Sequence, residues 1–331
     1  MNTTTASNIR APSWLQGHRA LKSRKKLNAL IGAAALLVMA TAHVIPAFVF
    51  SQNADTENTA EVPSATSGRA KAGTPAMEWA FGGYGGVTYT HPASVEIKNS
   101  DRNTDLTVKD FGWIGRPFKA PVYYGVRIQR WPSTGSFGTM LDFTHAKAIA
   151  KREDEATFSG TLNGEEVKEK QRIGDFFRHL EFSHGHNMLT LNGLARLAPA
   201  WSRFRPYVGA GAGISLPHTE VGIHKEIYNE DARTYEYQFA GFVGQGLAGL
   251  EIQLGRASVF LEYKFSYAPY NVPLSHEYYG WLLITDLWRQ FSSWWAGEKP
   301  PGGRLTTTLA THHGIAGVMV RNHTGISAPD L

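Results

Sequence analysis

The feature that most constrains the fold is strict two-residue alternation over Val259–Tyr267. Large apolar or aromatic side chains occupy every second position, and the positions between them include Glu262, Lys264 and Ser266. Because successive side chains of a strand point to opposite faces, this spacing predicts a β-strand and not a helix. Two structures fit such a strand: a soluble sandwich with its polar face in water, or a membrane barrel with its apolar face in lipid.

The rest of the chain favours the membrane barrel. We expect eight strands, over residues 78–89, 121–130, 137–149, 177–197, 206–221, 237–254, 257–270 and 305–320. Long connections follow the odd-numbered strands, at 91–120, 150–176, 222–236 and 271–304, and short connections follow the even-numbered strands. Outer-membrane barrels show this alternation, with short periplasmic turns and long external loops. The sequence therefore predicts an all-β fold, an eight-stranded antiparallel transmembrane β-barrel of the bacterial outer membrane with long external loops.

Residues 1–54 are predicted to be a leader that contains a secretory signal peptide. The basic cluster Arg19–Lys26 precedes an apolar run at 27–40, and Ala40-Thr41-Ala42 offers a cleavage site of small residues. An uncleaved anchor is the alternative, because Val44–Phe50 continues the apolar character. Either reading places the chain outside the cytoplasm.

The remaining boundaries follow from composition. Residues 55–76 are rich in Ala, Thr, Ser, Glu and Pro, which predicts a disordered linker. The barrel is expected over 77–322, and residues 323–331 form a C-terminal tail. The leader holds six Lys and Arg residues and no acid, so 27 of the 33 basic residues remain for the rest of the chain against 28 acidic ones. The folded part therefore has no basic excess that would indicate nucleic-acid binding.

Histidines gather at the external ends of the predicted strands. His184 and His186 are two positions apart on one strand, so both are expected on the same face, beside Glu181. This spacing suits two ligands of one metal ion, or a catalytic base and its partner. His145 is a further candidate ligand. Asp142, which is expected to point inward, and Glu181 are the candidate catalytic carboxylates. The structural alternatives are histidines at the headgroup rim and salt bridges that fill the lumen.

The last external loop is unusually aromatic. Four of the nine Trp residues lie within Trp281–Trp295. Trp prefers the membrane interface, so this segment is either part of an aromatic belt or a lid that grips lipid. Trp281, Trp288 and Arg289, together with Lys147, are the candidate substrate-binding residues.

Five segments together resemble the outer-membrane lipid A oxidases: Tyr84–Pro92, Pro121–Arg127, Met140–Ala148, Phe182–Asn187 and Thr285–Trp288. The resemblance spans about Met77–Val320. It implies oxidation of the proximal glucosamine of lipid A to 2-aminogluconate, with molecular oxygen as acceptor and lipopolysaccharide of the outer leaflet as substrate. No flavin or nicotinamide fold is visible in the sequence. Because the chain has no Cys, a divalent metal would have to be held by His and carboxylate side chains.

Two other functions remain open at this point. A lipid A deacylase or acyltransferase on the same barrel would use Ser183 with His184 or His186. Adjacent strand residues point to opposite faces, which makes Ser183 with His184 a poor pair. A non-enzymatic surface antigen or adhesin would need variable polar loops but no cluster of ionisable groups.

Overall fold

The structure of the protein is a computed structural model that describes residues 77–132, 135–199, 202–224, 227, 232–277 and 279–323. The predicted leader at 1–54, the predicted linker at 55–76 and the predicted tail beyond residue 323 lie outside the described residues. None of the helices in the described part is both long enough and apolar enough to cross a membrane.

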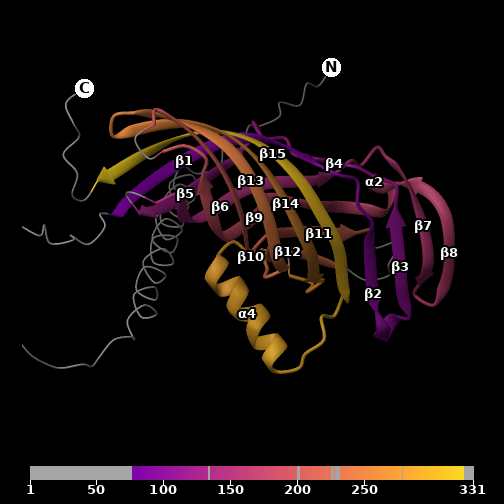
Figure 1. The fold of residues 1–331 in the computed structure, drawn as a ribbon. Helices are drawn as coiled ribbons and strands as arrows, with labels where there is room; N and C mark the ends of the chain where they lie inside the picture. Colours follow the sequence, from indigo (N-terminus) through magenta and orange to yellow (C-terminus); the bar gives the residue numbers. More distant parts are fainter. Residues whose placement is uncertain are drawn as a thin grey trace, which may run out of the picture. The chain divides into compact units, whose positions relative to one another are not determined.

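Eight long antiparallel strands close into a barrel (Figure 1). In order around the barrel they are β1 (Met77–Thr90), β5 (Tyr124–Pro132), β6 (Phe137–Ala150), β9 (Phe177–Arg196), β10 (Phe204–Ser215), β13 (Gly241–Leu254), β14 (Ala257–Pro273) and β15 (Arg304–His323). The pairing of β1 with β15, which runs from Glu78 opposite His323 to Thr90 opposite Thr311, completes the ring. Each strand overlaps one of the eight predicted strands, so the predicted all-β barrel fold is confirmed.

The two ends of the barrel differ as the loop lengths predicted. The start of β1 pairs with the end of β5, so the first described residues lie beside the short connection between β5 and β6. The end of β15 pairs with the start of β14, beside the two-residue turn at Gly255 and Arg256. Both ends of the described chain therefore lie at the same end of the barrel. We call the opposite end, which carries the long connections, the loop end.

The outside of the barrel is apolar. On β14, Leu261 is 66% exposed, whereas Glu262 and Lys264 are 4% and 0% exposed. The same alternation recurs around the ring, where exposed large apolar residues include Phe81, Val126, Leu191, Phe242 and Val318. The apolar face of the Val259–Tyr267 stretch thus points outward and its polar face points inward, as predicted for a barrel.

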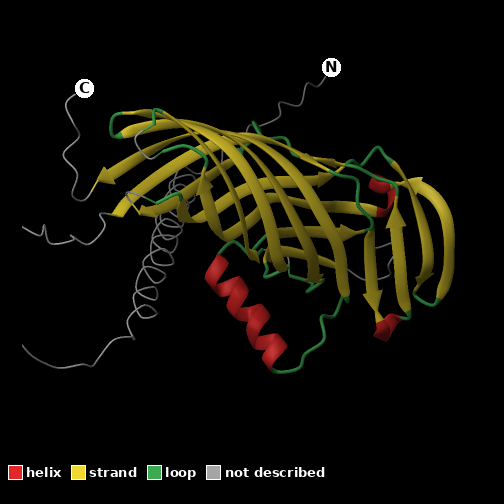
Figure 2. Ribbon diagram, viewed as in Figure 1, coloured by secondary structure: helices red, strands yellow, loops and turns green. Residues whose placement is uncertain are grey.

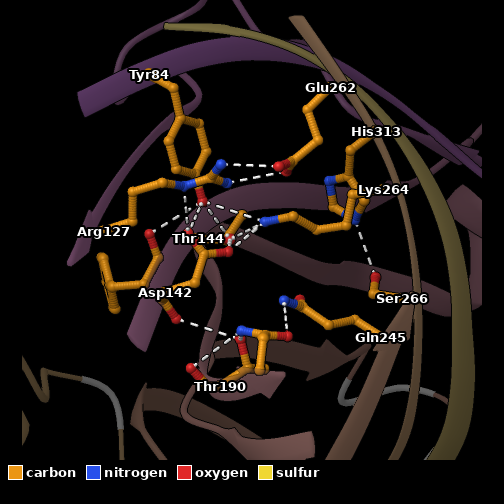
Figure 3. Close-up of polar contacts among 12 residues, drawn as sticks. Tyr84, Arg127, Asp142, Thr144, Thr190, Gln245, Glu262, Lys264, Ser266 and His313 are labelled. Atoms are coloured by element: carbon orange, nitrogen blue, oxygen red, sulfur yellow. Dashed lines mark hydrogen bonds and ion pairs between the residues drawn. The ribbon is translucent and has the colours of Figure 1, made fainter. Parts of the chain in front are cut away.

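Paired charges fill the middle of the barrel (Figure 3). The Arg127 guanidinium donates two hydrogen bonds to Glu262, at 2.8 and 2.9 Å, and a third to Asp142 at 3.2 Å. Lys264 also donates to Asp142, and the Tyr84 hydroxyl lies 3.0 Å from the same carboxylate. Each of these ionisable side chains is almost fully buried. Buried ions are costly unless they are paired, and here the predicted pairing is present.

Small residues allow the wall to pack closely where β9, β10 and β13 meet. Strand β10 reads Val208-Gly-Ala-Gly-Ala-Gly213, and a Cβ placed on Gly213 would lie only 1.9 Å from the Leu189 carbonyl oxygen. A larger side chain at that position would force the strands apart. Glycine within a strand often marks such a close approach of another backbone.

The long connections contain regular structure that the sequence did not predict. Their elements are β2 (Val95–Asn99), η2 (Ser100–Arg102), β3 (Thr104–Lys109), β4 (Trp113–Ile114), β7 (Glu155–Leu162), β8 (Glu165–Arg172), α2 (Ile173–Phe176), β12 (Arg233–Tyr237) and α4 (Leu283–Trp295). Strand β11 (His218–Ile223) begins inside the strand predicted over 206–221, which is broken in two after Ser215. Strands β2, β3, β7 and β8 extend the sheet from the edge of β15 beyond the barrel (Figure 2). Their apolar side chains, such as Val95, Leu106 and Phe158, form a core with Phe176 and Phe182. The first two long connections are therefore folded and packed segments.

Candidate functional site

The candidate site lies at the loop end, where β11 folds back along β9. Residue Glu220 of β11 stands opposite Glu181 of β9, and the other edge of β11 pairs with β12. This arrangement brings His218 and Glu220, which are two positions apart on β11, next to His184 of β9. The three residues are called the His/Glu cluster below.

The His/Glu cluster is compact. The Nδ1 atom of His184 lies 2.6 Å from Oε1 of Glu220, and Nδ1 of His218 lies 3.2 Å from the same oxygen. One nitrogen of each histidine and one carboxylate oxygen all lie within 4.8 Å of one another. The backbone N–H of His184 and the Ser183 hydroxyl also donate to the Glu220 carboxylate. Glu220 therefore gathers donors from two adjacent residues of β9.

The hydrogen-bond partners of His218 restrict its protonation state. Its Nε2 atom lies 2.9 Å from the Gly280 carbonyl oxygen, which can only accept. Its Nδ1 atom faces Glu220, whose carboxylate is also an acceptor when ionised. A neutral imidazole carries one N–H, so it can satisfy only one of these two acceptors. The ring is therefore either an imidazolium that donates to both acceptors or a neutral imidazole that donates to one of them. In the neutral form that donates to Gly280, the lone pair of Nδ1 is available for a cation.

Glu220 is suited to remain an anion in this position. Burial on its own raises the pKa of a carboxyl group, but hydrogen bonds and charge from His184 and His218 outweigh burial and lower the pKa of Glu220 to about 2. The carboxylate is thus ionised at neutral pH. Two imidazole nitrogens and one carboxylate oxygen form the ligand set of facial-triad metal sites, which leave further coordination positions open.

An aromatic wall lines the His/Glu cluster. The ring of Trp281 lies 5.2 Å from the His184 ring and 5.5 Å from the His218 ring, measured between centroids. Tyr235 of β12 packs edge-on against His218 at 4.7 Å. Trp281 is 43% exposed, so part of its side chain can contact an incoming molecule. A sugar or an acyl chain could stack on such a surface.

The expectation that His184 and His186 share a strand face and a ligand set is wrong. The pairing of β9 with β6 shifts register in this segment, where Ala146 pairs with His186 but Ala148 pairs with Phe182. This irregularity separates the environments of the two histidines. His186 is fully buried and hydrogen-bonds through Nδ1 to the Tyr270 hydroxyl. It has no contact with the His/Glu cluster among those described.

Three other predicted site residues also have different partners. Nδ1 of His145 lies 2.8 Å from Oδ1 of Asn187, and its ring stacks on Tyr124, so it is no ligand of the His/Glu cluster. Asp142 lies in the barrel interior, where it pairs with Lys264 and Arg127. Glu181 stands next to the cluster in the strand register, but its carboxylate contacts His179 at 3.2 Å.

The four predicted substrate-binding residues separate into two groups. Trp281 forms the wall of the His/Glu cluster, as described above, and Trp288 lies on the exposed side of α4. Arg289 makes ion pairs with Asp286 at 2.8 Å and with Glu277 at 2.6 Å. The Lys147 ammonium donates to the Lys119 carbonyl oxygen at 2.7 Å. Arg289 and Lys147 are therefore already engaged within the protein.

Sequence reasoning missed His218 and Glu220. They lie two positions apart on a strand, which is the same spacing that singled out His184 and His186. The segment His218-Thr-Glu220 thus carried a usable signal. The spacing could not predict that β11 folds back and pairs with β9. This pairing places Glu220 beside His184 and not beside another histidine.

Comparisons with known proteins identify no family for this chain. No protein-family model matches the chain, and no curated protein matches it. Among solved structures, it is similar to the secretin-domain β-barrel InvG of the Salmonella SPI-1 injectisome, with 10% identity and a TM-score of 0.15, over 77% of this chain and 64% of that one. The pilotin–secretin complex AspS–GspD of ETEC has 9% identity and a TM-score of 0.11, over 75% and 48% of the two chains. The chain thus spans less than two thirds of either structure, and neither similarity carries a functional argument.

Proposed function

We propose that the barrel spans the bacterial outer membrane with its loop end facing outward. Most outward-facing residues of the eight strands are apolar, and the charged residues in the middle of the interior are paired with one another. A membrane barrel needs an apolar outer face because lipid contacts it, and it needs paired interior charges because unpaired ions in the membrane span are costly. Its closed ring also leaves no open sheet edge in the lipid. A soluble barrel would expose Leu261, Phe242 and Val318 to water without compensation.

We further propose that the protein modifies lipid A, by oxidising its proximal glucosamine to 2-aminogluconate with molecular oxygen. The observation that carries this proposal is the His/Glu cluster, which lies at the loop end beside an exposed Trp281. On an outward-facing loop end, this position gives access to lipid headgroups. The resemblance of the segments around Asp142, His184 and Trp288 to lipid A oxidases supports the choice of reaction.

The proposed oxidation takes place at C1 of the proximal glucosamine. The C1 carbon of the sugar, a hemiacetal with a free hydroxyl group, loses two electrons and two protons and becomes a lactone carbonyl. Oxygen accepts both electrons and both protons and becomes hydrogen peroxide. Water then opens the lactone to the aldonic acid. The product therefore gains the mass of one oxygen atom, and a phosphate on C1 would prevent the first step.

In this proposal His184, His218 and Glu220 would hold a divalent metal ion. Such an ion, when bound, supplies a Lewis acid and a coordination position for oxygen. The protein's own residues do the remaining work. Glu220 provides the negative charge, Gly280 fixes the ring orientation of His218, and Trp281 offers a face on which the sugar can lie.

The geometry does not favour the deacylase alternative. The Ser183 hydroxyl donates to both oxygens of Glu220, at 3.1 and 3.0 Å, and His184 contacts the same carboxylate. A serine nucleophile needs a hydrogen bond from its hydroxyl to a base, usually a histidine that a carboxylate orients in turn. Here Ser183 and His184 each contact Glu220 directly, and the histidine does not lie between the serine and the carboxylate.

The test is mass spectrometry of lipid A after incubation with the purified protein in detergent. We expect lipid A with a free C1 hydroxyl to gain one oxygen atom, with an equal amount of hydrogen peroxide. The matched control is lipid A phosphorylated at C1, which should not react. Loss of an acyl chain would establish the deacylase instead. Unchanged lipid A from protein that is folded and supplied with metal would overturn the enzymatic proposal and leave a surface antigen or adhesin.

A further inference from the structure

Helix α4 exposes its aromatic face. Ile284, Trp288, Phe291 and Trp295 recur at intervals of three or four residues, so they lie along one side of the helix. All four side chains are exposed, as is Trp294 beside them, and Trp288 is 68% exposed. A helix packed on a protein surface normally turns such a face inward. An exposed row of this kind marks a surface that contacts a partner.

The polar face of α4 holds the helix against the barrel. A carboxylate oxygen of Asp286 accepts a hydrogen bond from the backbone N–H of Tyr237 at 3.1 Å. The Gln290 side chain accepts from the backbone N–H of Phe239 at 2.7 Å and donates to its carbonyl oxygen at 2.9 Å. Arg289 lies 3.5 Å from the Glu236 carboxylate. These contacts fix the orientation of the helix and leave its aromatic face exposed.

The aromatic face continues the apolar wall of the barrel. Gln290 is hydrogen-bonded to the backbone of Phe239. The Phe239 ring packs edge-on against Phe242 at the start of β13, with centroids 5.9 Å apart. Phe242 is 71% exposed and belongs to the outward-facing row of the barrel. The exposed face of α4 bears no charged side chain and is rich in Trp, the residue that prefers the boundary between headgroups and acyl chains. These properties match a lipid surface better than a protein partner.

We propose that the aromatic face of α4 inserts into the interface of the outer leaflet and holds the His/Glu cluster at the depth of the lipid headgroups. This inference rests on the membrane placement proposed above and adds its own element, an interfacial helix. The helix and the His/Glu cluster are joined by a short stretch of chain, because Gly280 and Trp281 contact the cluster and lie just before the helix. A helix anchored in the leaflet would therefore present the Trp281 wall to lipids that diffuse past it.

The absence of Cys from the sequence makes a direct test possible. Single cysteines replace Trp288 or Phe291, and each carries a nitroxide spin label in full-length protein reconstituted in phosphatidylcholine vesicles. Leu261→Cys on the barrel wall is the lipid control, and Lys168→Cys on exposed strand β8 is the water control. The measurement is the ratio of collision rates with oxygen, which concentrates in lipid, and with a water-soluble nickel chelate.

The labels at 288 and 291 are expected to show an oxygen-to-nickel ratio close to that of the Leu261 position. If they match the Lys168 position while the Leu261 label remains in lipid, α4 is not inserted and the inference fails, although the membrane barrel stands. If the Leu261 label is also in water, the membrane placement itself fails.

A third arm replaces Trp288, Phe291 and Trp294 together with Ser. This triple variant should lower oxidation of lipid A in vesicles more than in detergent micelles, and an equal loss in both would indicate a purely structural role of the helix.

Discussion

Nδ1 of His184 and Oε1 of Glu220 lie 2.6 Å apart, although the two residues are 36 positions apart in the chain. The contact exists because β11 pairs with the loop-end part of β9. The His/Glu cluster is thus assembled by strand pairing and not by local sequence. Its three side chains make no contact with the paired charges inside the barrel among those described.

His184→Ala, His218→Ala and Glu220→Gln should each lower lipid A oxidation by at least about 100-fold, the usual effect of removing a positioned catalytic group. The barrel should remain folded, because none of the three side chains pairs with the interior charges. The readouts are the mass of the lipid A product and the heat-dependent gel mobility of the barrel. His91→Ala is the matched control, since His91 contacts His312 and lies outside the cluster. Wild-type rates in all three cluster variants would show that the site assignment is wrong.

His186→Gln should keep close to the wild-type oxidation rate. His186 is buried and hydrogen-bonds to Tyr270, and it contributes no ligand to the His/Glu cluster. The same mass measurement, on the same preparation as His184→Ala, separates two histidines that the sequence could not distinguish. Equal loss of activity in both variants, with both barrels folded, would return His186 to the catalytic site.

The ionisation of Glu220 should make stability fall in acid. Its pKa is lowered from 4.5 to about 2, so its folded-state interactions favour the ionised form. The resulting stability is fully present above pH 4.5 and is lost as pH falls toward 2. We expect wild-type protein to lose more thermal stability than Glu220→Gln between those pH values. The measurement is the unfolding temperature of each protein in detergent, and parallel pH curves would contradict the expectation.

Asp142→Ala should destabilise the barrel by about 3–5 kcal/mol, because it leaves the buried Lys264 without its carboxylate partner. Adding Lys264→Met removes the unpaired charge and should restore part of the loss. Equilibrium unfolding of the single and double variants in urea measures both effects. If the single variant were as stable as wild type, the buried pair would not contribute as described.

Leu261→Arg should destabilise membrane insertion by about 2–4 kcal/mol, the range for a charge on the lipid-facing side of a barrel near the bilayer midplane. Leu261→Phe is the control, since it keeps an apolar side chain at the same position. Folding yield into vesicles, read from gel mobility, compares the two. Equal yields would mean that the Leu261 side of β14 does not contact lipid.

The barrel could be predicted because its signals are local. Alternation at Val259–Tyr267 indicated which residues point inward, and the parity of loop lengths indicated closure. Both signals depend on spacing along a single strand. The strand expected over 206–221 was too long only because β10 ends at Ser215 and β11 begins at His218, with Pro217 between them. A proline break followed by further apolar alternation is hard to distinguish from one continuous strand.

The site could be predicted only in part because its contacts are long-range. The sequence placed His184 at the external end and Trp281 in an aromatic loop, and the structure brings these two together. It could not supply the register shift near Gly185 that separates His184 from His186. Nor could it show that the Asp286 carboxylate would bind the Tyr237 backbone and so orient the aromatic side of α4.

The paired charges in the middle of the barrel restrict the route by which a substrate can reach the His/Glu cluster. Arg127, Glu262, Asp142 and Lys264 meet across the interior, so the middle of the barrel is occupied by side chains. Under the proposed function, a lipid substrate would reach the His/Glu cluster by lateral diffusion within the leaflet. Oxidation of lipid A is then expected to follow surface-dilution kinetics: its rate should depend on the mole fraction of lipid A in the membrane, and adding inert lipid at constant total lipid A should slow it.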